Sequence, residues 1–580
     1  MEMLFSVGQS FVFFSLLSLY LCLFFFMTSN KRPSVGFKHY PFVGALPGFL
    51  RNRHRFVDWS TEILKQCPNN TATFHRLGKI HGVITANPAN VEHILKTNFE
   101  NYPKGQRFVT LLEDFLGRGI FISEGELWKV QRKTSSYEFN TKSFRNFVMH
   151  DIRFETLSRL VPTLAKNGQL VDLQDILQRY TFDNICKLAF NFDPASLGGD
   201  GTAGSEFMRA FGDAATLSSG RFYYAFKRMW SIKKKFNIGS ERKLKNSIEI
   251  VHEFVNNIIR SRLEEKSENV DEDLLSRFIG NSENSTEFLR DIVVSFIQAG
   301  RETTSSVLSW FFWLLASHPK VEQNILKELE SIWARNGRNI GDTYSLDELR
   351  DMHYLHAAMS ETLRLCASVP VDTKACQSDD MLPDGTYVGK KWFVMYHAYA
   401  MGRMESIWGQ NCNEFLPERW LENGTYRPEH VFRFPAFHAG PRMCLGKDMA
   451  YILMKSIAAS VIERFVIDVQ DKDTCPEKVL SFTLSMKDGL HVRVKERRNP
   501  SFFFLSYPRG ILGRALTVGS TFKPVPQLRL EVSARTGRHR FSQQMRLPCD
   551  SNWGANPVKP LKGTPLPVEP TLCWLDVTLL

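Results

Sequence analysis

The stretch FHAGPRMCLGKDMA, residues 437–450, decides how this chain folds, because it places one cysteine in a loop bounded by glycines. Cys444 has no other cysteine nearby in the sequence. A glycine lets the backbone approach a flat partner closely, since it has no side chain in the way. We therefore expect Gly440 and Gly446 to allow such an approach on either side of Cys444.

The residues around Cys444 favour its use as a ligand. Arg442 supplies a positive charge for an anionic group, and a helical pattern begins near Leu445. The unpaired N–H groups of a helix start and nearby positive charge both favour the thiolate form of a cysteine. A thiolate in such a loop suits the iron of a haem, with Arg442 near a propionate. A lone cysteine is more often an inert buried side chain, and this alternative stays open at this point.

The string from Phe437 to Gly446 resembles the F-x-x-G-x-R-x-C-x-G loop of the cytochrome P-450 monooxygenases at every specified position. The resemblance covers roughly residues 35–497. It implies a mainly helical fold with a small β region (α+β) and haem b held by the Cys444 thiolate. It also implies electrons from NADPH through a separate reductase.

A second landmark of the family is E-x-x-R, which is Glu361-Thr-Leu-Arg364 here. A spacing of three places the two charges on one face of a helix. In the family this pair is buried and joined by a downstream arginine, and Arg419 in FLPERWL stands at the matching place. The resemblance implies a buried structural network of these three charges behind the cysteine loop. Taken alone, an E-x-x-R pair is usually a surface ion pair of little energetic value.

A third segment, FIQAGRETTSS (296–306), resembles the oxygen-activating segment of the family. Ala299 and Thr303 are four residues apart and share one helix face. Gly300 is expected to leave room for a diatomic ligand or to loosen the helix ladder locally. Glu302 with Thr303 is expected to relay protons. Close relatives more often carry Asp where Glu302 stands. Without the cysteine loop, such a Ser/Thr run would usually be a packing feature.

Trp128 and Arg132, in LWKVQRK, match a fourth landmark that holds haem propionates in the family. Their spacing of four aims both side chains the same way. Lys374, ten residues after Arg364, is expected to make a further propionate contact. The proline pair that usually follows the E-x-x-R helix is reduced to Pro370, which is expected to alter the substrate wall.

Helical patterns dominate residues 50–498, which we predict to be one catalytic domain. A long helix is predicted over 286–318, a hairpin that turns at 384–385, and a glycine-rich surface loop at 197–205. Residues 499–580 hold ten of the 26 prolines and lack helical or strand periodicity. We predict that this tail has little order and carries no part of the function.

Residues 1–30 hold a single charged side chain and an apolar run long enough to span a bilayer as one helix. The length and the lack of a basic start disfavour a cleaved signal peptide. Lys31, Arg32 and Lys38 follow directly, so the positive-inside rule predicts that the rest of the chain is cytosolic. Residues 31–49 are predicted to be a Pro/Gly hinge. The chain is thus expected to be a single-pass protein of the endoplasmic reticulum membrane.

The amino-acid composition argues for some classes of binding partner and against others. The ten cysteines contain no C-x-x-C pair, which argues against a disulfide framework and a cysteine zinc site. The formal charge is +12, but residues 499–580 alone carry ten Lys/Arg against four Asp/Glu. The distribution of charge therefore argues against nucleic acid as a partner. The 46 phenylalanines suggest either a large, aromatic-rich interior or a lipophilic small-molecule substrate.

Six segments look like those of plant fatty-acid ω-hydroxylases, namely 52–64, 87–108, 117–121, 138–148, 172–190 and 236–244. This resemblance implies hydroxylation of the terminal or near-terminal carbon of long-chain fatty acids. Hydroxylation of jasmonoyl-isoleucine or of a steroid side chain is an alternative within the same group. A haem-thiolate isomerase of lipid hydroperoxides and a catalytically silent haem-binding protein are alternatives from other classes.

Basic side chains lead to three further expectations. Lys104 and Arg107 could meet a substrate carboxylate, or simply be solvated. Lys133 and Lys447, near the thiolate side, could steer an acidic reductase. The aromatic and basic segment 221–245 is either an interfacial membrane contact or a solvated basic helix face.

Overall fold

The computed structural model describes residues 13–22, 35–40, 42–76, 80–140, 142–166, 168–197, 203–224, 227–264, 273–337 and 342–497. Residues 1–497 form one unit and residues 498–580 a second one, which lies outside the described residues. The tail predicted over 499–580 therefore stays a prediction.

Residues 13–22 are helical, and their large apolar side chains are exposed. Among the residues that the structure describes, no helix is both long and apolar enough to cross a membrane. The remainder of the anchor predicted over 1–30 lies outside the described residues. The anchor and the hinge that follows it are not tested by the fold.

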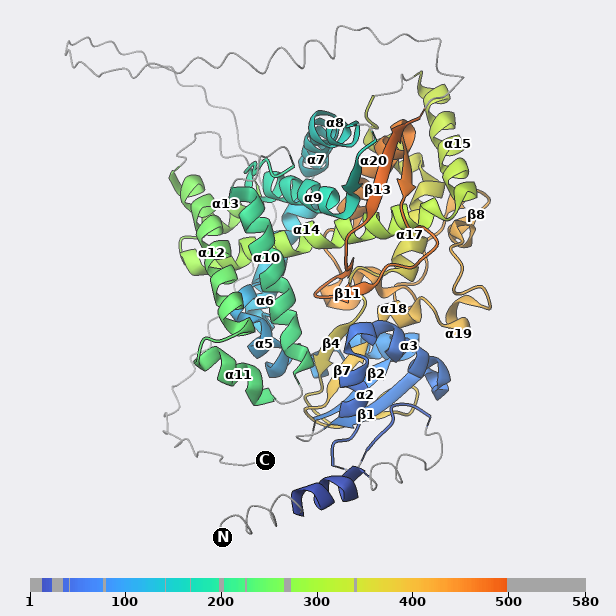
Figure 1. The fold of residues 1–580 in the computed structure, drawn as a ribbon. Coiled ribbons are helices and arrows are strands. Elements are labelled where there is room, and N and C mark those ends of the chain that lie inside the picture. The colour runs from blue at the N-terminus through green and yellow to red at the C-terminus, as the bar shows by residue number, and fades with distance from the viewer. Residues whose placement is uncertain are drawn as a thin grey trace, which may run out of the picture. The chain divides into compact units, whose positions relative to one another are not determined.

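Helices make up most of the described chain, as the sequence predicts (Figure 1). The α-helices are α2 (Leu46–Arg51), α3 (Phe56–Gln66), α4 (Pro88–Glu92), α5 (Gln106–Leu116), α6 (Gly125–Asn140), α7 (Lys142–Glu155), α8 (Val161–Leu164), α9 (Leu173–Phe190), α10 (Ala203–Gly220), α11 (Lys227–Lys235), α12 (Ser240–Glu264), α13 (Leu274–Ile279), α14 (Thr286–Ala316), α15 (Pro319–Asn336), α16 (Leu346–Asp351), α17 (His353–Leu365), α18 (Ala398–Met401), α19 (Glu405–Trp408) and α20 (Lys447–Arg464). The loop predicted over 197–205 is shorter than expected, because α10 already begins at residue 203.

The strands are short and form small sheets, which agrees with the predicted α+β class. The strands are β1 (Thr71–Arg76), β2 (Ile80–Thr85), β3 (Leu170–Asp172), β4 (Asp372–Ala375), β5 (Asp380–Met381), β6 (Tyr387–Val388), β7 (Phe393–Tyr396), β8 (Leu421–Glu422), β9 (Thr425–Tyr426), β10 (Phe465–Val469), β11 (Lys478–Leu480), β12 (Leu484–Met486) and β13 (His491–Glu496). One sheet has the order β1-β2-β7-β4, in which only β2 and β7 are parallel. The predicted hairpin at 384–385 is confirmed, since β5 and β6 pair antiparallel around it.

Helix α14 is the long helix that the sequence predicts, and Figure 1 shows it between α10 and α17. The Ser285 hydroxyl accepts a hydrogen bond from the N–H of Phe288 and so caps its first turn. The helix ends at Ala316, just before Pro319, where a proline removes the next backbone donor. It packs against α9, α12 and α17 and is buried along most of its length. Residues on α14 are therefore held rigidly.

Gly300 lies where α14 packs against α9. A Cβ atom at this position would stand 2.5 Å from Cγ1 of Ile185. The space of the missing side chain is thus filled by Ile185, and α14 continues through the position without a break. This corrects the expectation that Gly300 leaves room for a diatomic ligand. Its small size serves the contact between two helices.

We expect Gly300→Ala to destabilise the protein by about 1–3 kcal/mol, because the added methyl group overlaps Ile185. Thermal unfolding followed by circular dichroism measures the effect. The double variant Gly300→Ala/Ile185→Ala should lose less stability than the sum of the two single variants, since the alanine at 185 removes the overlap. Strict additivity of the two changes would contradict the packing role.

Candidate active site

Cys444 lies in a loop that is closed by its own backbone and leads into α20. The backbone N–H of Cys444 donates to the carbonyl of Phe437 (2.9 Å), and that of Met443 donates to Gly440 (3.0 Å). The Cys444 side chain remains partly accessible and is a free thiol. The loop therefore holds a sulfur atom in a defined place at the start of a buried helix.

Burial raises the pKa of the Cys444 thiol. The backbone N–H of Gly446 and the charges of Arg132 and Lys447 act in the opposite direction without overcoming burial. The helix start and the nearby cations therefore favour the thiolate, as the sequence predicts, but burial has the larger effect. A metal ion bound to the sulfur would displace the proton, because coordination deprotonates a thiol outright.

The two glycines of the loop have different functions. Gly440 has φ +66°, and a Cβ atom there would lie 2.0 Å from the carbonyl oxygen of Leu95. A glycine is therefore required at position 440 because the backbone there lies directly against Leu95. This corrects the expectation that Gly440 lets a flat partner approach the loop. A Cβ atom at Gly446 would meet only Phe139 and the Cys444 sulfur, at ordinary contact distances.

A cluster of cations and aromatic rings surrounds the loop. The guanidinium of Arg442 lies over the ring of Trp128, 4.4 Å from its centroid. Nη2 of Arg442 donates to a carboxylate oxygen of Glu124 (2.5 Å). Nη2 of Arg132 donates to the carbonyl of Met443 (2.5 Å), next to the cysteine. The structure thus brings the three predicted propionate contacts together beside Cys444.

Lys374, which belongs to β4 and is distant in sequence from the cysteine loop, joins this cluster. Its side chain is buried, with Nζ 3.4 Å from the carboxylate of Asp372. Burial lowers the pKa of Lys374 to about 7, and the charges of Lys104 and Arg442 add to the effect, while Asp372 opposes it. Lys104 also binds Asp372, at 2.8 Å. Buried cations therefore crowd this region.

These residues fit a haem. Within the described ranges, no group of three or more His, Cys, Asp and Glu side chains could hold a metal ion. A metal at Cys444 would therefore have to bring most of its own ligands, as haem iron does. The adjacent cations, two arginines and two lysines, outnumber the two carboxylates beside them, Glu124 and Asp372. Such a surplus suits a doubly charged anionic group.

An apolar cavity of about 240 Å³ lies against α14. Ala299 and Thr303 both line it, and the Thr303 hydroxyl donates to the Ala299 carbonyl (2.6 Å). The phenylalanines in its wall are Phe49, Phe56, Phe74, Phe108, Phe121, Phe222, Phe393 and Phe482. Ligand pockets typically combine such apolar walls with a few polar groups.

The segment 221–245 contributes to this cavity, which the sequence did not indicate. Phe222 and Tyr223 line the cavity, directly after α10. Arg221 is buried, and its Nη2 donates to the carboxylate of Glu241 (2.6 Å). The first residues of the segment are thus neither a membrane contact nor a solvated face. The ion pair of Arg221 fixes the turn that presents the two rings.

Glu302 faces a different space from Thr303. Its carboxylate accepts hydrogen bonds from Arg301 (2.9 Å), Gln298 (3.0 Å) and Thr483 (3.3 Å). It lines a second, polar cavity of about 350 Å³. Gln298 and Thr483 also line the apolar cavity. The Glu302 carboxylate and the Thr303 hydroxyl therefore face different spaces, and Gln298 and Thr483 lie between them, since each contacts Glu302 and lines the apolar cavity.

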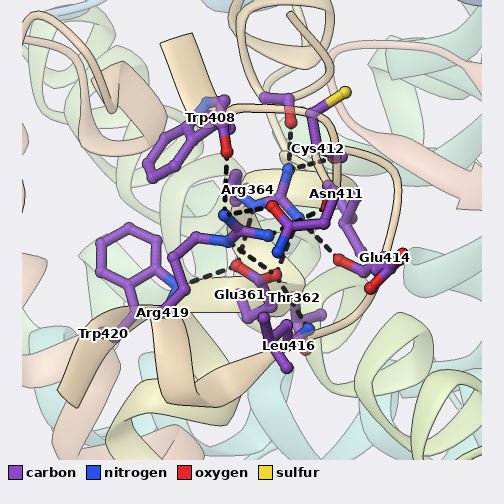
Figure 2. A network of polar contacts seen from close by, with 12 residues as sticks. Glu361, Thr362, Arg364, Trp408, Asn411, Cys412, Glu414, Leu416, Arg419 and Trp420 are labelled. Carbon is purple, nitrogen blue, oxygen red and sulfur yellow. Dashed lines mark hydrogen bonds and ion pairs between the residues drawn. The ribbon is translucent and has the colours of Figure 1, made fainter. Parts of the chain in front are cut away.

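Glu361, Arg364 and Arg419 meet in one buried network, which Figure 2 shows from close by. Two parallel hydrogen bonds of 2.7 Å join the guanidinium of Arg364 to both carboxylate oxygens of Glu361. Nε of Arg419 lies 3.3 Å from the same carboxylate, and the indole N–H of Trp420 donates to it (2.8 Å). The backbone N–H of Leu416 donates to it as well (3.0 Å).

The two arginines extend this network to backbone carbonyls. Arg364 donates to the carbonyls of Gly402, Cys412 (2.5 Å) and Glu414 (2.8 Å). Arg419 donates to the carbonyls of Trp408 (3.1 Å) and Asn411 (3.0 Å). The network thus ties α17 to the segment 402–420, which leads toward the cysteine loop.

The fold, the cysteine loop and the surrounding cations define a haem-thiolate protein. The sequence profile of the cytochrome P-450 family matches residues 35–491. The chain is 51% identical to cytochrome P-450 CYP94D108 from Paris polyphylla over 473 residues, which is 81% of this chain and 93% of the relative. It is 44% identical to cytochrome P-450 94A1 from Vicia sativa, over 79% of this chain and 90% of that relative.

A third relative, cytochrome P-450 94C1 from Arabidopsis thaliana, is 44% identical over 76% of this chain and 89% of its own length. The chain therefore belongs to the cytochrome P-450 family and is a monooxygenase of that family. The resemblance found in the cysteine loop is confirmed. The family uses a haem with a thiolate-bound iron and takes its electrons from a reductase.

Proposed function

We propose that this enzyme hydroxylates the terminal or near-terminal carbon of long-chain fatty acids, with dioxygen and electrons from NADPH. The observation that carries the proposal is the apolar cavity, which is lined by aromatic side chains and borders on Ala299 and Thr303 of α14. A hydrocarbon chain gains free energy when such walls remove it from water. The similarity to plant relatives of one P-450 group supports the same substrate class.

When bound at Cys444, the haem supplies the iron at which dioxygen is activated. Cys444 would hold the iron, while Arg132, Arg442, Trp128 and Lys374 would hold the propionates. The other residues of the site exclude water from the substrate and deliver protons to the cavity. The phenylalanines of the cavity exclude water from the substrate chain, so that protons arrive only along defined groups.

Protons reach the cavity from the polar side of α14. Glu302 takes a proton from the polar cavity and is held in place by Arg301. The Thr483 hydroxyl contacts Glu302 and lines the apolar cavity, so it can pass the proton across, while the Gln298 amide holds the Glu302 carboxylate in place by a hydrogen bond. The Thr303 hydroxyl donates it where oxygen is activated, after it releases the Ala299 carbonyl.

The partners and the location follow from the same proposal. NADPH-cytochrome reductase delivers the electrons, and Lys133 and Lys447 on the side of the thiolate steer its acidic surface. Lys133 is exposed and Lys447 half-buried. Residues 1–30 anchor the protein in the endoplasmic reticulum membrane, and the catalytic domain, residues 50–498, is cytosolic.

Microsomes that contain this protein and the reductase test the proposal. Lauric and oleic acids, supplied with NADPH, are expected to yield ω-hydroxy or near-terminal hydroxy acids by mass spectrometry. Microsomes with the reductase alone are the control, and jasmonoyl-isoleucine is assayed beside the fatty acids. Oxidation of the conjugate alone, or conversion of a lipid hydroperoxide without NADPH, would contradict the proposal.

A further inference from the structure

Two arginines stand in the wall of the apolar cavity. Arg76 is the last residue of β1, and only 9% of its surface is exposed. Arg107 lies in the first turn of α5. Both residues line the same cavity as Ala299 and Thr303. The function proposed above assigns neither guanidinium a partner.

Neither guanidinium has a carboxylate within ion-pair distance among the residues that the structure describes. Other buried arginines are paired, such as Arg221 with Glu241 (2.6 Å) and Arg301 with Glu302 (2.9 Å). Nε of Arg76 is buried and lacks any hydrogen-bond partner. An unpaired buried charge is costly, so such a group points to a partner outside the chain.

The contacts that the two guanidinium groups make are with aromatic rings. Arg76 lies over Phe49, 5.0 Å from the ring centroid. Arg107 lies 5.9 Å from the ring of Phe222 and 5.6 Å from that of Phe393. These rings orient the guanidinium planes by cation–π contact and leave their N–H groups available.

The two charges also act on each other. Burial, and to a smaller extent the positive charge of Arg76, lower the pKa of Arg107 to about 10. Burial lowers the pKa of Arg76 as well. Both groups stay protonated at neutral pH, because an arginine does not deprotonate there. Two like charges therefore share one apolar wall.

Lys104 does not belong to this pair. The sequence suggested Lys104 and Arg107 as joint contacts of a substrate carboxylate. Lys104 instead donates to Asp372 (2.8 Å), beside the propionate contacts. Its charge is already neutralised by the protein, so the second free cation of the cavity is Arg76.

We infer that Arg76 and Arg107 bind the carboxylate of the substrate and make the enzyme selective for free acids over esters and alcohols. This inference rests on the proposed function and deepens it. A guanidinium fork matches the two oxygens of a carboxylate and forms strong, charge-assisted hydrogen bonds. The arginines belong to β1 and α5, whereas Thr303 belongs to α14. Because the arginines and Thr303 line the same cavity, a carboxylate held by the arginines keeps the hydrocarbon chain in the space that Thr303 borders.

Binding to the purified, haem-loaded protein tests the inference. Isothermal titration calorimetry is run with dodecanoic acid and with its methyl ester. Arg76→Gln and Arg107→Gln are each expected to weaken binding of the acid about tenfold or more, while binding of the ester changes less than about twofold. Arg350→Gln is the matched control, because Arg350 is exposed and pairs only with exposed Asp347 (3.0 Å). It should leave both ligands unaffected.

Equal loss of affinity for acid and ester, or no loss for either, would overturn the inference. If a glutamine variant does not fold, the unmodified protein decides the question with dodecanoic acid and dodecyltrimethylammonium. A clear preference for the anion supports the site, and equal binding of the cation refutes it. The two proposals can fail separately. If the arginines bind fatty acids but only a carboxylate-bearing conjugate is hydroxylated, the proposed function fails and the carboxylate site stands.

Discussion

Replacement of Glu361 by glutamine is expected to destabilise the protein by about 3–5 kcal/mol, because it removes one partner of a buried ion pair. Both carboxylate oxygens accept hydrogen bonds from Arg364, and the side chain is fully buried. A glutamine would place an NH2 group against a guanidinium donor and leave the charge of Arg364 uncompensated. Thermal unfolding and the haem content of the purified protein measure the loss.

The control for this prediction is Glu422→Gln. Glu422 pairs with Arg427 on the surface, where both side chains are mostly exposed. Exposed pairs contribute about 0–1 kcal/mol, so this variant should unfold close to the unmodified protein. If Glu361→Gln were as stable as Glu422→Gln, the network would not hold the segment before the cysteine loop.

Replacement of Cys444 by alanine is expected to reduce turnover by more than about 100-fold. Changes to the outer partners of a metal site already cost about 10–100-fold, and here the protein's own ligand is removed. Reductase-coupled hydroxylation of lauric acid measures the effect. Cys475→Ala is the matched control, because Cys475 is an exposed free thiol outside the cysteine loop. Retained turnover in Cys444→Ala would contradict the assignment of the ligand.

The parts of the site that the sequence predicts are those set by local spacing. Glu361 and Arg364 are three residues apart on α17, so the helix alone brings them together. Cys444 and Arg442 occupy one loop, and the apolar run of α14 predicts a buried helix over nearly its full length. In each case the sequence separation is short enough for backbone geometry to determine the contact.

The parts that the sequence does not predict depend on contacts between distant segments. Lys104 finds Asp372 across 268 residues, and no local pattern indicates this pair. Gly300 faces Ile185 only because α14 packs on α9. Arg76 ends β1, where only two apolar residues, Ala72 and Phe74, mark the buried face, so the charged residue that continues this face is not recognised as buried from its type. The direction of a charged side chain becomes apparent only when its surroundings are known.

The absorption spectrum of the reduced, carbon monoxide-bound protein shows whether the Cys444 thiolate binds the iron, because the Soret band reports which atom of the protein is the ligand. We expect a band at the position that a thiolate ligand produces. This band should disappear in Cys444→Ala and persist in Cys475→Ala. A Soret band at the position of a nitrogen ligand in the unmodified protein, or a thiolate band that survives in Cys444→Ala, would contradict the role of Cys444 as the iron ligand.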